Sequence, residues 1–172
     1  VQSGMGADFL MNDKCSAGTG KFLEIMTNRL GLTQTELSVL ARSGQPISIS
    51  SMCTVFAESE VISLIGKGTP REDIAFGVVE SVVMKVVSLV SQVKSDKYFL
   101  TGGLCEDDYV LERLSLALDS PVTSHPLARY AGAIGAALLG AKKNQTVEAK
   151  TPGGIVKFKV LAITLTNAAS VS

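Results

Sequence analysis

Apolar positions recur along the chain with two spacings, one typical of helices and one typical of strands. Apolar residues that return every three to four positions predict helices over about 19–31, 33–44, 54–66, 69–93, 106–118 and 126–143. Short alternating or apolar runs between turn residues predict strands within 97–103, 121–125 and 155–163, a strand or strand end at 7–12, and a strand or extended segment at 46–50. Strands that alternate with helices indicate a layered α/β fold, whose ligands bind at the turns that follow the strands.

Several predicted helix ends carry their own signals. Gly31 follows the first helix, at a position that favours a left-handed residue. Thr33 and Glu36 predict a capping box for the second helix. Thr69 is the predicted N-cap of the fourth helix, with a proline next and Glu72 completing a second box.

Composition narrows the class of protein. The chain has 172 residues, enough for one domain with a sizeable core. Its 16 Lys and Arg residues balance 16 Asp and Glu residues, so no overall charge favours nucleic acid or an anionic membrane. The apolar stretch at 74–93 contains Glu80 and Lys85, which favours a buried helix over a membrane span. Three cysteines, an odd number, and no recognisable signal peptide indicate a cytoplasmic protein.

The chain is expected to divide near Lys143. Residues 1–143 form one predicted lobe, whereas residues 144–172 combine polar ends with the alternating run at 155–163. This tail is expected to be an added strand or hairpin, or disordered. The chain begins at Val1 without a Met, as a processed piece or an excised fragment would.

The stretch "NDKCSAGTGKFLE" has the look of a phosphate-binding loop but fails its spacing. A Walker A loop reads G-x-x-x-x-G-K-S/T, because a glycine opens the loop and a hydroxyl after the lysine holds Mg²⁺. Gly20 and Lys21 would be the G-K pair. Cys15 then stands at the opening position and Phe22 at the hydroxyl position. A G-x-G-x-x-G loop fails too, because Leu23 occupies the place of the third glycine.

Cys15 and Cys53 share one setting, because each comes just before a predicted helix. A helix N-terminus presents N–H groups and a partial positive charge, which stabilise a thiolate or an anionic sulfur cluster. The alternative is that both are small buried hydrophobes, the commonest state of a cysteine outside a disulfide.

Two thiolates do not close a metal site, because zinc and iron–sulfur clusters normally take four protein ligands. Cys105 and His125 would complete a Cys₃His zinc site, but the spacing matches no zinc ribbon or finger, and His125 is expected to be structural. A twofold dimer in which each chain contributes Cys15 and Cys53 would supply four thiolates across one interface.

The stretch "FLTGGLCED" is the second candidate site. Thr101, Gly102 and Gly103 follow a predicted strand, and the missing Cβ atoms let a ligand approach the backbone closely. The alternative is a tight turn between strand and helix that binds nothing. No Ser-His-Asp arrangement or pair of carboxylates stands out.

Four motifs together resemble one family: "MNDKCSAGTGKFLE", "SSMCTVFAESEVISLIGKGT", "FLTGGLCED" and "HPLARYAGAIGAALLGAKK". Over roughly residues 9–143 they are similar to the activator component of 2-hydroxyacyl-CoA dehydratases, a group that includes the ATPase subunits of benzoyl-CoA reductase. The resemblance implies the second lobe of the acetate/sugar kinase–actin–chaperone ATPase fold, which is ribonuclease H-like.

The resemblance also implies cofactors and partners. Such activators are homodimers that share one 4Fe–4S cluster, held by two cysteines of each subunit that match Cys15 and Cys53. ATP with Mg²⁺ is bound and hydrolysed, and this drives one low-potential electron into the dehydratase. Ferredoxin or flavodoxin recharges the activator. The residues implied to approach the nucleotide are Gly18, Thr19, Gly20, Lys21, Thr101, Gly102 and Gly103.

The chain also departs from this family. The Gly-rich, Asp-containing phosphate loop and the "DIGGQD"-like loop of the first half are absent, and Gly4-Met5-Gly6 has no acidic residue to organise Mg²⁺. The chain thus resembles the second lobe alone, and impaired ATP hydrolysis is expected. Lys21 stands where Arg is usual, and Cys105 is an extra thiol that is expected to be structural.

Three functions are compatible with these patterns. The first is the ATP-dependent electron donor, and the second is a non-redox lobe of a sugar- or acetate-kinase-like enzyme. The third is a partner-binding fragment that lost both activities with its first lobe. Cys15 and Cys53 favour the first over the second, whereas only an assay separates the first from the third.

Overall fold

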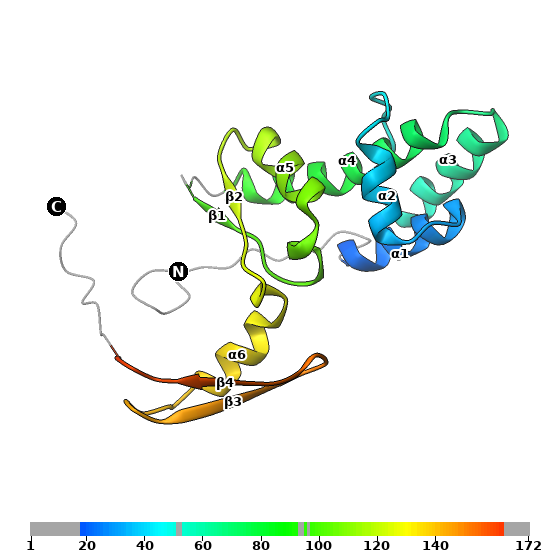
Figure 1. Ribbon diagram of the computed structural model, residues 1–172. Coiled ribbons are helices and arrows are strands. Elements are labelled where there is room, and N and C mark those ends of the chain that lie inside the picture. The colour runs from blue at the N-terminus through cyan, green and yellow to red at the C-terminus, as the bar shows by residue number, and fades with distance from the viewer. Residues whose placement is uncertain (1–17, 51–52, 93–94, 96, 164–172) are drawn as a thin grey trace.

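The computed structural model describes residues 18–50, 53–92, 95 and 97–163. Its α-helices are α1 (Thr19–Leu30), α2 (Gln34–Ala41), α3 (Thr54–Gly66), α4 (Arg71–Val90), α5 (Asp108–Ala117) and α6 (Ala131–Leu138). Two short 3-10 turns, η1 (Gly103–Glu106) and η2 (Ala128–Tyr130), precede α5 and α6. The strands are β1 (Tyr98–Phe99), β2 (Val122–Thr123), β3 (Thr146–Thr151) and β4 (Gly154–Lys159), as Figure 1 shows.

Helix α4 is the centre of the core. Helices α1, α2, α3 and α5 all pack against it. Its fully buried aliphatic side chains include Ile74, Val78, Val79, Val82 and Val83. Each such side chain contributes about 1.5–3 kcal/mol by leaving water. The prediction of a buried helix in this apolar stretch is therefore confirmed. No helix in the described ranges is long and apolar enough to span a bilayer.

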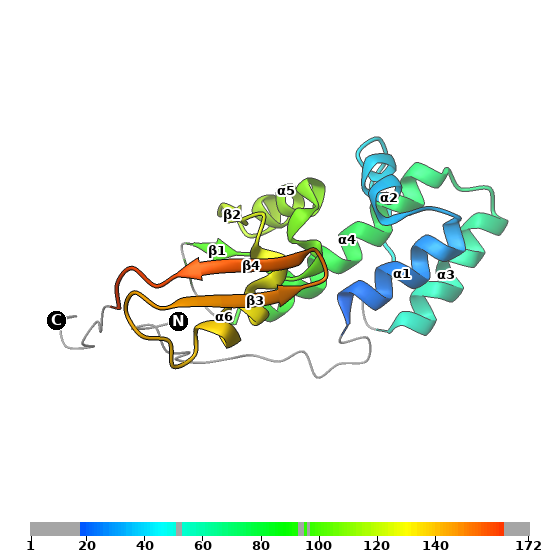
Figure 2. The ribbon, with the colours of Figure 1, turned by 60° about the horizontal axis from the view of Figure 1, so that its bottom comes forward.

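Helices α1 and α3 lie side by side and begin at the same end of the pair (Figure 2). Helix α1 starts after Gly18 and ends at Gly31, whose φ of 62° is left-handed, as predicted. Phe22 and Met26 of α1 are buried in the same cluster as Ala57 of α3. The first turns of both helices are thereby held together at one edge of the lobe.

The other layer is a small strand–helix–strand unit. β1 and β2 pair in parallel, with Tyr98 opposite Val122 and Phe99 opposite Thr123. The connection between them runs through η1 and α5, and α5 packs on α4. A crossover of this kind is what parallel strands require. The turn that contains Gly102 therefore lies at the carboxyl end of β1, where folds of this class bind ligands.

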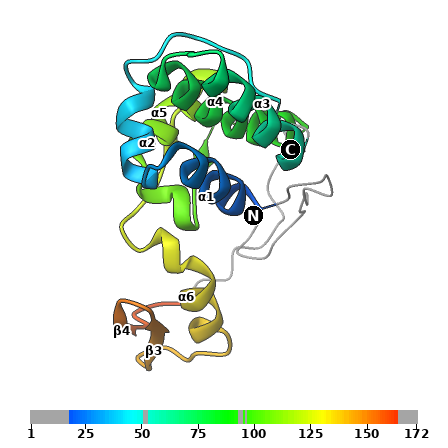
Figure 3. The ribbon, with the colours of Figure 1, turned by 90° about the vertical axis from the view of Figure 1, so that its right-hand side faces the viewer.

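Strands β3 and β4 form an antiparallel hairpin that packs on α6. Val147 and Ala149 are buried on its inner face, and the hairpin extends with α6 away from the helical body (Figure 3). The alternating run expected at 155–163 is thus β4 and the residues after it. At the turn, a Cβ on Gly153 would lie 3.0 Å from the Tyr130 hydroxyl oxygen, so this contact favours glycine.

Two predictions of local structure need correction. Of the strand or extended segment expected at 46–50, the strand does not form, because Ile47 and Ile49 pack over α4 at Gly77 instead of pairing with a neighbouring backbone. Thr69 is not the N-cap of α4, because Pro70 occupies that position and no side chain caps the helix.

Four predicted helices also have different ends. The helix expected over 33–44 is α2, which ends at Ala41. Helix α4 ends at Val90 rather than near 93. The helix expected over 106–118 begins as the η1 turn and becomes α-helical only after Asp107. The helix expected over 126–143 begins as η2 and stops at Leu138. The strand expected within 7–12 lies outside the described residues.

The capping box of α2 is present as predicted, and it gives a testable expectation. Replacing Thr33 by alanine should lower the free energy of unfolding by about 1 kcal/mol, because the N-cap hydroxyl is lost. Hydrogen bonds from Thr33 also hold the pKa of Glu36 below its ordinary value. A carboxyl with a lowered folded pKa stabilises the fold above its unfolded pKa and loses that effect as the pH falls through the folded pKa.

The measurement is urea unfolding of the wild type and Thr33→Ala across the acidic range. The gap between them should narrow as the pH falls below 4.5. Ser59→Ala, which removes a hydroxyl bonded within α3, is the control and should change little at any pH. A gap that widens in acid would contradict this account of the cap.

Candidate functional site

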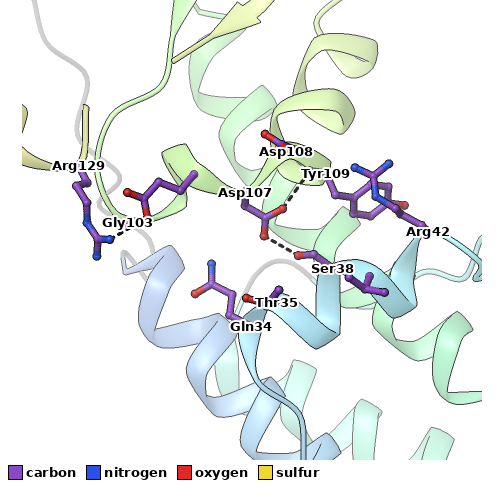
Figure 4. A pocket seen from close by; sticks show the side chains of 11 residues that line it. Gln34, Thr35, Ser38, Arg42, Gly103, Asp107, Asp108, Tyr109 and Arg129 are labelled. Atoms are coloured by element: carbon purple, nitrogen blue, oxygen red, sulfur yellow. Dashed lines mark hydrogen bonds and ion pairs between the residues drawn. The ribbon is translucent and has the colours of Figure 1, made fainter. Parts of the chain in front are cut away.

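A cavity of about 460 Å³ opens between α2 and the turn that follows β1 (Figure 4). One wall is α2, with the exposed Gln34 and Thr35 and the buried Ser38. The opposite wall is η1 and the start of α5, with Gly103 and Asp107. Amide, hydroxyl and carboxylate groups thus face one another across the cavity, beside backbone that carries no side chain at Gly103.

The turn after β1 has the shape that its glycines permit. Gly102 has φ 92° and ψ −167°, a backbone conformation that residues with a Cβ rarely adopt. Its N–H donates to the carbonyl oxygen of Ala128 at 3.3 Å, which ties the turn to η2. Gly103 then enters the cavity wall with nothing within 4 Å of the position that a Cβ would take.

Asp107 links the two walls. Its Oδ1 accepts hydrogen bonds from the N–H groups of Tyr109 at 3.1 Å and Val110 at 3.2 Å, which caps α5. Its Oδ2 accepts a hydrogen bond of 2.5 Å from the Ser38 hydroxyl on α2 (Figure 4). One carboxylate therefore serves a helix cap and a contact between helices that are far apart in sequence.

Further contacts join α2 and α5 beside the Ser38–Asp107 bond, and together they form a polar seam between the two helices. The Tyr109 hydroxyl donates to the carbonyl oxygen of Ala41 at 3.2 Å, and the Arg42 guanidinium lies 4.8 Å from the Tyr109 ring centre. Burial raises the pKa of Tyr109, so its hydroxyl stays protonated and remains a donor. Arg42 also pairs with Glu112 of α5 at 2.7 Å.

A second region of interest lies where α1 and α3 begin. Cys53 is the N-cap residue of α3, with extended backbone at φ −143° and ψ 136°, and is half-buried. The Ser50 N–H donates to a carboxylate oxygen of Glu60 at 2.8 Å, which fixes the chain just before this cysteine. Arg29 of α1 pairs with Glu58 of α3, so the two helices are also joined by charge.

The structure places the nucleotide-contact candidates at two locations. Gly103 lines the cavity, and Thr101 and Gly102 immediately precede it. Gly18, Thr19, Gly20 and Lys21 form the start of α1 and are not among the residues that line it. Lys21 pairs with Glu24 at 2.7 Å on the surface.

Of the cysteine candidates, Cys53 and Cys105 lie in the described residues. Cys15 lies outside the described residues, and within the described ranges no group of three or more His, Cys, Asp or Glu residues could hold a metal ion. Cys105 is buried in η1, apart from the helix starts. His125 accepts a hydrogen bond at Nδ1 from the Leu127 N–H at 3.1 Å, a local role that fits the expectation of a structural residue.

The sequence did not reveal the α2 wall. Gln34, Thr35 and Ser38 are ordinary polar residues on an amphipathic helix, and no motif marks them. Only the packing of α2 against α5 gives them a cavity to face.

Comparison with protein families matches residues 1–140 to the BadF/BadG/BcrA/BcrD ATPase family. The chain belongs to this family. It is 45% identical over 145 residues to the (R)-2-hydroxyglutaryl-CoA dehydratase activating ATPase of Acidaminococcus fermentans, covering 83% of this chain and 56% of that protein.

Two solved structures share the fold. The crystal structure of component A of the A. fermentans dehydratase has a TM-score of 0.74 at 42% identity, covering 81% of this chain and 54% of that one. The activator of the 2-hydroxyisocaproyl-CoA dehydratase from Clostridium difficile, solved with ADPNP, has a TM-score of 0.70 at 37% identity, covering 77% and 50%.

These likenesses confirm the predicted family and the α/β, actin-like ATPase fold. The chain spans about half the length of the relatives that it matches.

Proposed function

We propose that this chain is the second lobe of an ATP-dependent activator that donates single electrons to a 2-hydroxyacyl-CoA dehydratase. The observation that carries the proposal is a polar cavity at the glycine turn after β1, in a chain whose fold matches an activator solved with ADPNP. The name of the A. fermentans relative supports both the ATPase and the dehydratase partner.

The cavity is proposed as the part of the nucleotide site that this lobe contributes. Gly103 lets a ligand lie against the backbone, and Gln34 and Thr35 offer donors and acceptors from α2. Gly18, Thr19, Gly20 and Lys21, at the start of α1, are proposed to approach the nucleotide as well. We propose that Mg²⁺ binding and full ATP hydrolysis also depend on the part of the relatives that this chain does not match.

The chemistry around Cys53 fits a cluster ligand. A thiolate at the start of a 13-residue helix lies in the favourable field of the helix N-terminus. Cys15 and Cys53 of two chains would hold a 4Fe–4S cluster, a group that stores and passes on one electron. The Arg29–Glu58 pair joins α1 to α3, and the bond from Ser50 to Glu60 holds the segment before Cys53 against α3.

The surface beside Cys53 supports the proposed homodimer. Val55 and Phe56 follow it on α3 and are 64% and 67% exposed, and Ile62 further along is 52% exposed. A second copy that brought its own cysteines to this end would cover these side chains. The electron would then enter from ferredoxin or flavodoxin and leave to the dehydratase near the same end.

The proposed division of the chain keeps residues 1–143 as the ATPase lobe and 144–172 as an addition. The β3–β4 hairpin contacts α6 and the Tyr130 side chain, which belong to the end of that lobe. Its role would be to cover α6.

Anaerobic reconstitution with iron and sulfide tests the proposal, with metal analysis and size determination on the same sample. The expected result is a brown dimer with about four irons per two chains. Binding of ADP to the full chain is measured separately by calorimetry. A colourless monomer that binds no ADP would refute the proposed function.

A further inference from the structure

The contact between Ser38 and Asp107 crosses the cavity at its base. Ser38 is 8% exposed, and its hydroxyl donates to Asp107 Oδ2 at 2.5 Å. A hydrogen bond to a charged acceptor is about twice as strong as one between neutral groups. This bond therefore fixes the position of the middle of α2 relative to the start of α5.

The other oxygen of the same carboxylate fixes the second wall. Asp107 Oδ1 accepts from the backbone N–H groups of Tyr109 and Val110, so the carboxylate cannot rotate away from its bond with Ser38 without giving up the cap of α5. The distance between α2 and the start of α5 thus depends on the Asp107 side chain, whose two oxygens bond in fixed directions to Ser38 and to the cap of α5. Other bonds of the seam, from Tyr109 and Arg42, lie further along α2.

We propose that Asp107 is a positioning residue for the nucleotide, which acts through Ser38 to hold α2 at the distance from η1 and α5 that the ligand requires. This inference rests on the proposed function, because it takes the cavity to be the nucleotide site. The carboxylate does not contact the phosphates in this role. It sets the place of the hydroxyl and amide groups that α2 presents to the ligand.

Substitutions can separate the contribution of Ser38 from that of Asp107. Ser38→Ala removes the bond between the walls and leaves the cap of α5 intact. Asp107→Asn keeps an oxygen for the cap but offers Ser38 an uncharged amide. Ser38→Ala should raise the Kd for ADP about tenfold, the effect of losing one hydrogen bond to a charged group. Asp107→Asn should raise it by a smaller factor, and the double variant should match Ser38→Ala.

Calorimetric titration of the full chain with ADP measures these constants, and thermal unfolding of each variant is recorded beside them. Ser43→Ala is the matched control, because its hydroxyl bonds to the Leu40 carbonyl at the end of α2 and does not line the cavity. It should leave the Kd unchanged. Ser38→Thr, which retains a hydroxyl, should recover affinity.

Three results would count against the proposal. Wild-type binding with an unchanged Kd in Ser38→Ala would overturn the positioning role alone. Independent, multiplying effects of the two substitutions would show that the residues do not act through each other. Failure of the wild type itself to bind ADP would refute the proposed nucleotide site, and the positioning role with it.

Discussion

Replacing Cys53 by serine is expected to abolish uptake of the iron–sulfur cluster. The serine hydroxyl is a poor ligand for iron, and two of the four proposed thiolates disappear from each dimer. Because Cys53 is the N-cap of α3, serine should at the same time preserve the helix, since it is itself a favoured N-cap residue. The measurement is iron content and visible absorption after anaerobic reconstitution, with circular dichroism to show that the fold is retained.

Cys105 provides the control for this experiment. It is 4% exposed in η1, so alanine is a gentler replacement there than serine, whose hydroxyl would need a buried partner. Cys105→Ala should take up iron as the wild type does, and Cys15→Ser should fail as Cys53→Ser does. Equal loss of iron in Cys105→Ala would contradict the ligand assignment.

Gly44→Ala is expected to be strongly destabilising. A Cβ at this position would lie 2.1 Å from the carbonyl oxygen of Glu72 and 2.9 Å from the Phe76 Cβ, both on α4. The first of these is backbone in the opening turn of a helix, so it cannot rotate aside. We expect the free energy of unfolding to fall by about 3 kcal/mol, the upper part of the usual range for overpacking.

Urea unfolding measures this effect, and Gly66→Ala is the control. Gly66 is the last residue of α3, and nothing lies within 4 Å of the place its Cβ would take. Alanine there should be neutral or should stabilise by up to about 1 kcal/mol, because it restricts the unfolded chain. Similar losses in both variants would mean that the close approach at Gly44 is not what makes alanine costly.

The sequence predicted helix ends correctly where neighbouring residues alone determine them. Gly31 ends α1 in the left-handed conformation, and Thr33 with Glu36 caps α2, because each acts on residues within one turn. No strand forms at 46–50, because alternation alone does not supply a partner strand. Ile47 and Ile49 found an apolar surface on α4 instead.

The site was predictable on one side only. The glycines at 102 and 103 stand out because they follow a predicted strand, and Gly102 adopts backbone angles that few other residues adopt. Ser38 and Asp107 carry no comparable signal, since their contact joins positions 69 residues apart and depends on how α2 packs. The roles predicted for the cysteines and for a nucleotide came from the family resemblance, because composition and spacing alone left them open.

The seam between α2 and α5 has a consequence for the order in which the chain folds. Its three polar contacts join residues 68 to 70 positions apart, whereas α1, α2, α3 and α4 pack on one another within a continuous stretch of chain. During synthesis the helical layer can therefore assemble while α5 is still inside the ribosome. The cavity between α2 and α5 closes only when α5 emerges and docks, so a chain halted before that point would hold much of the core and none of the proposed binding site.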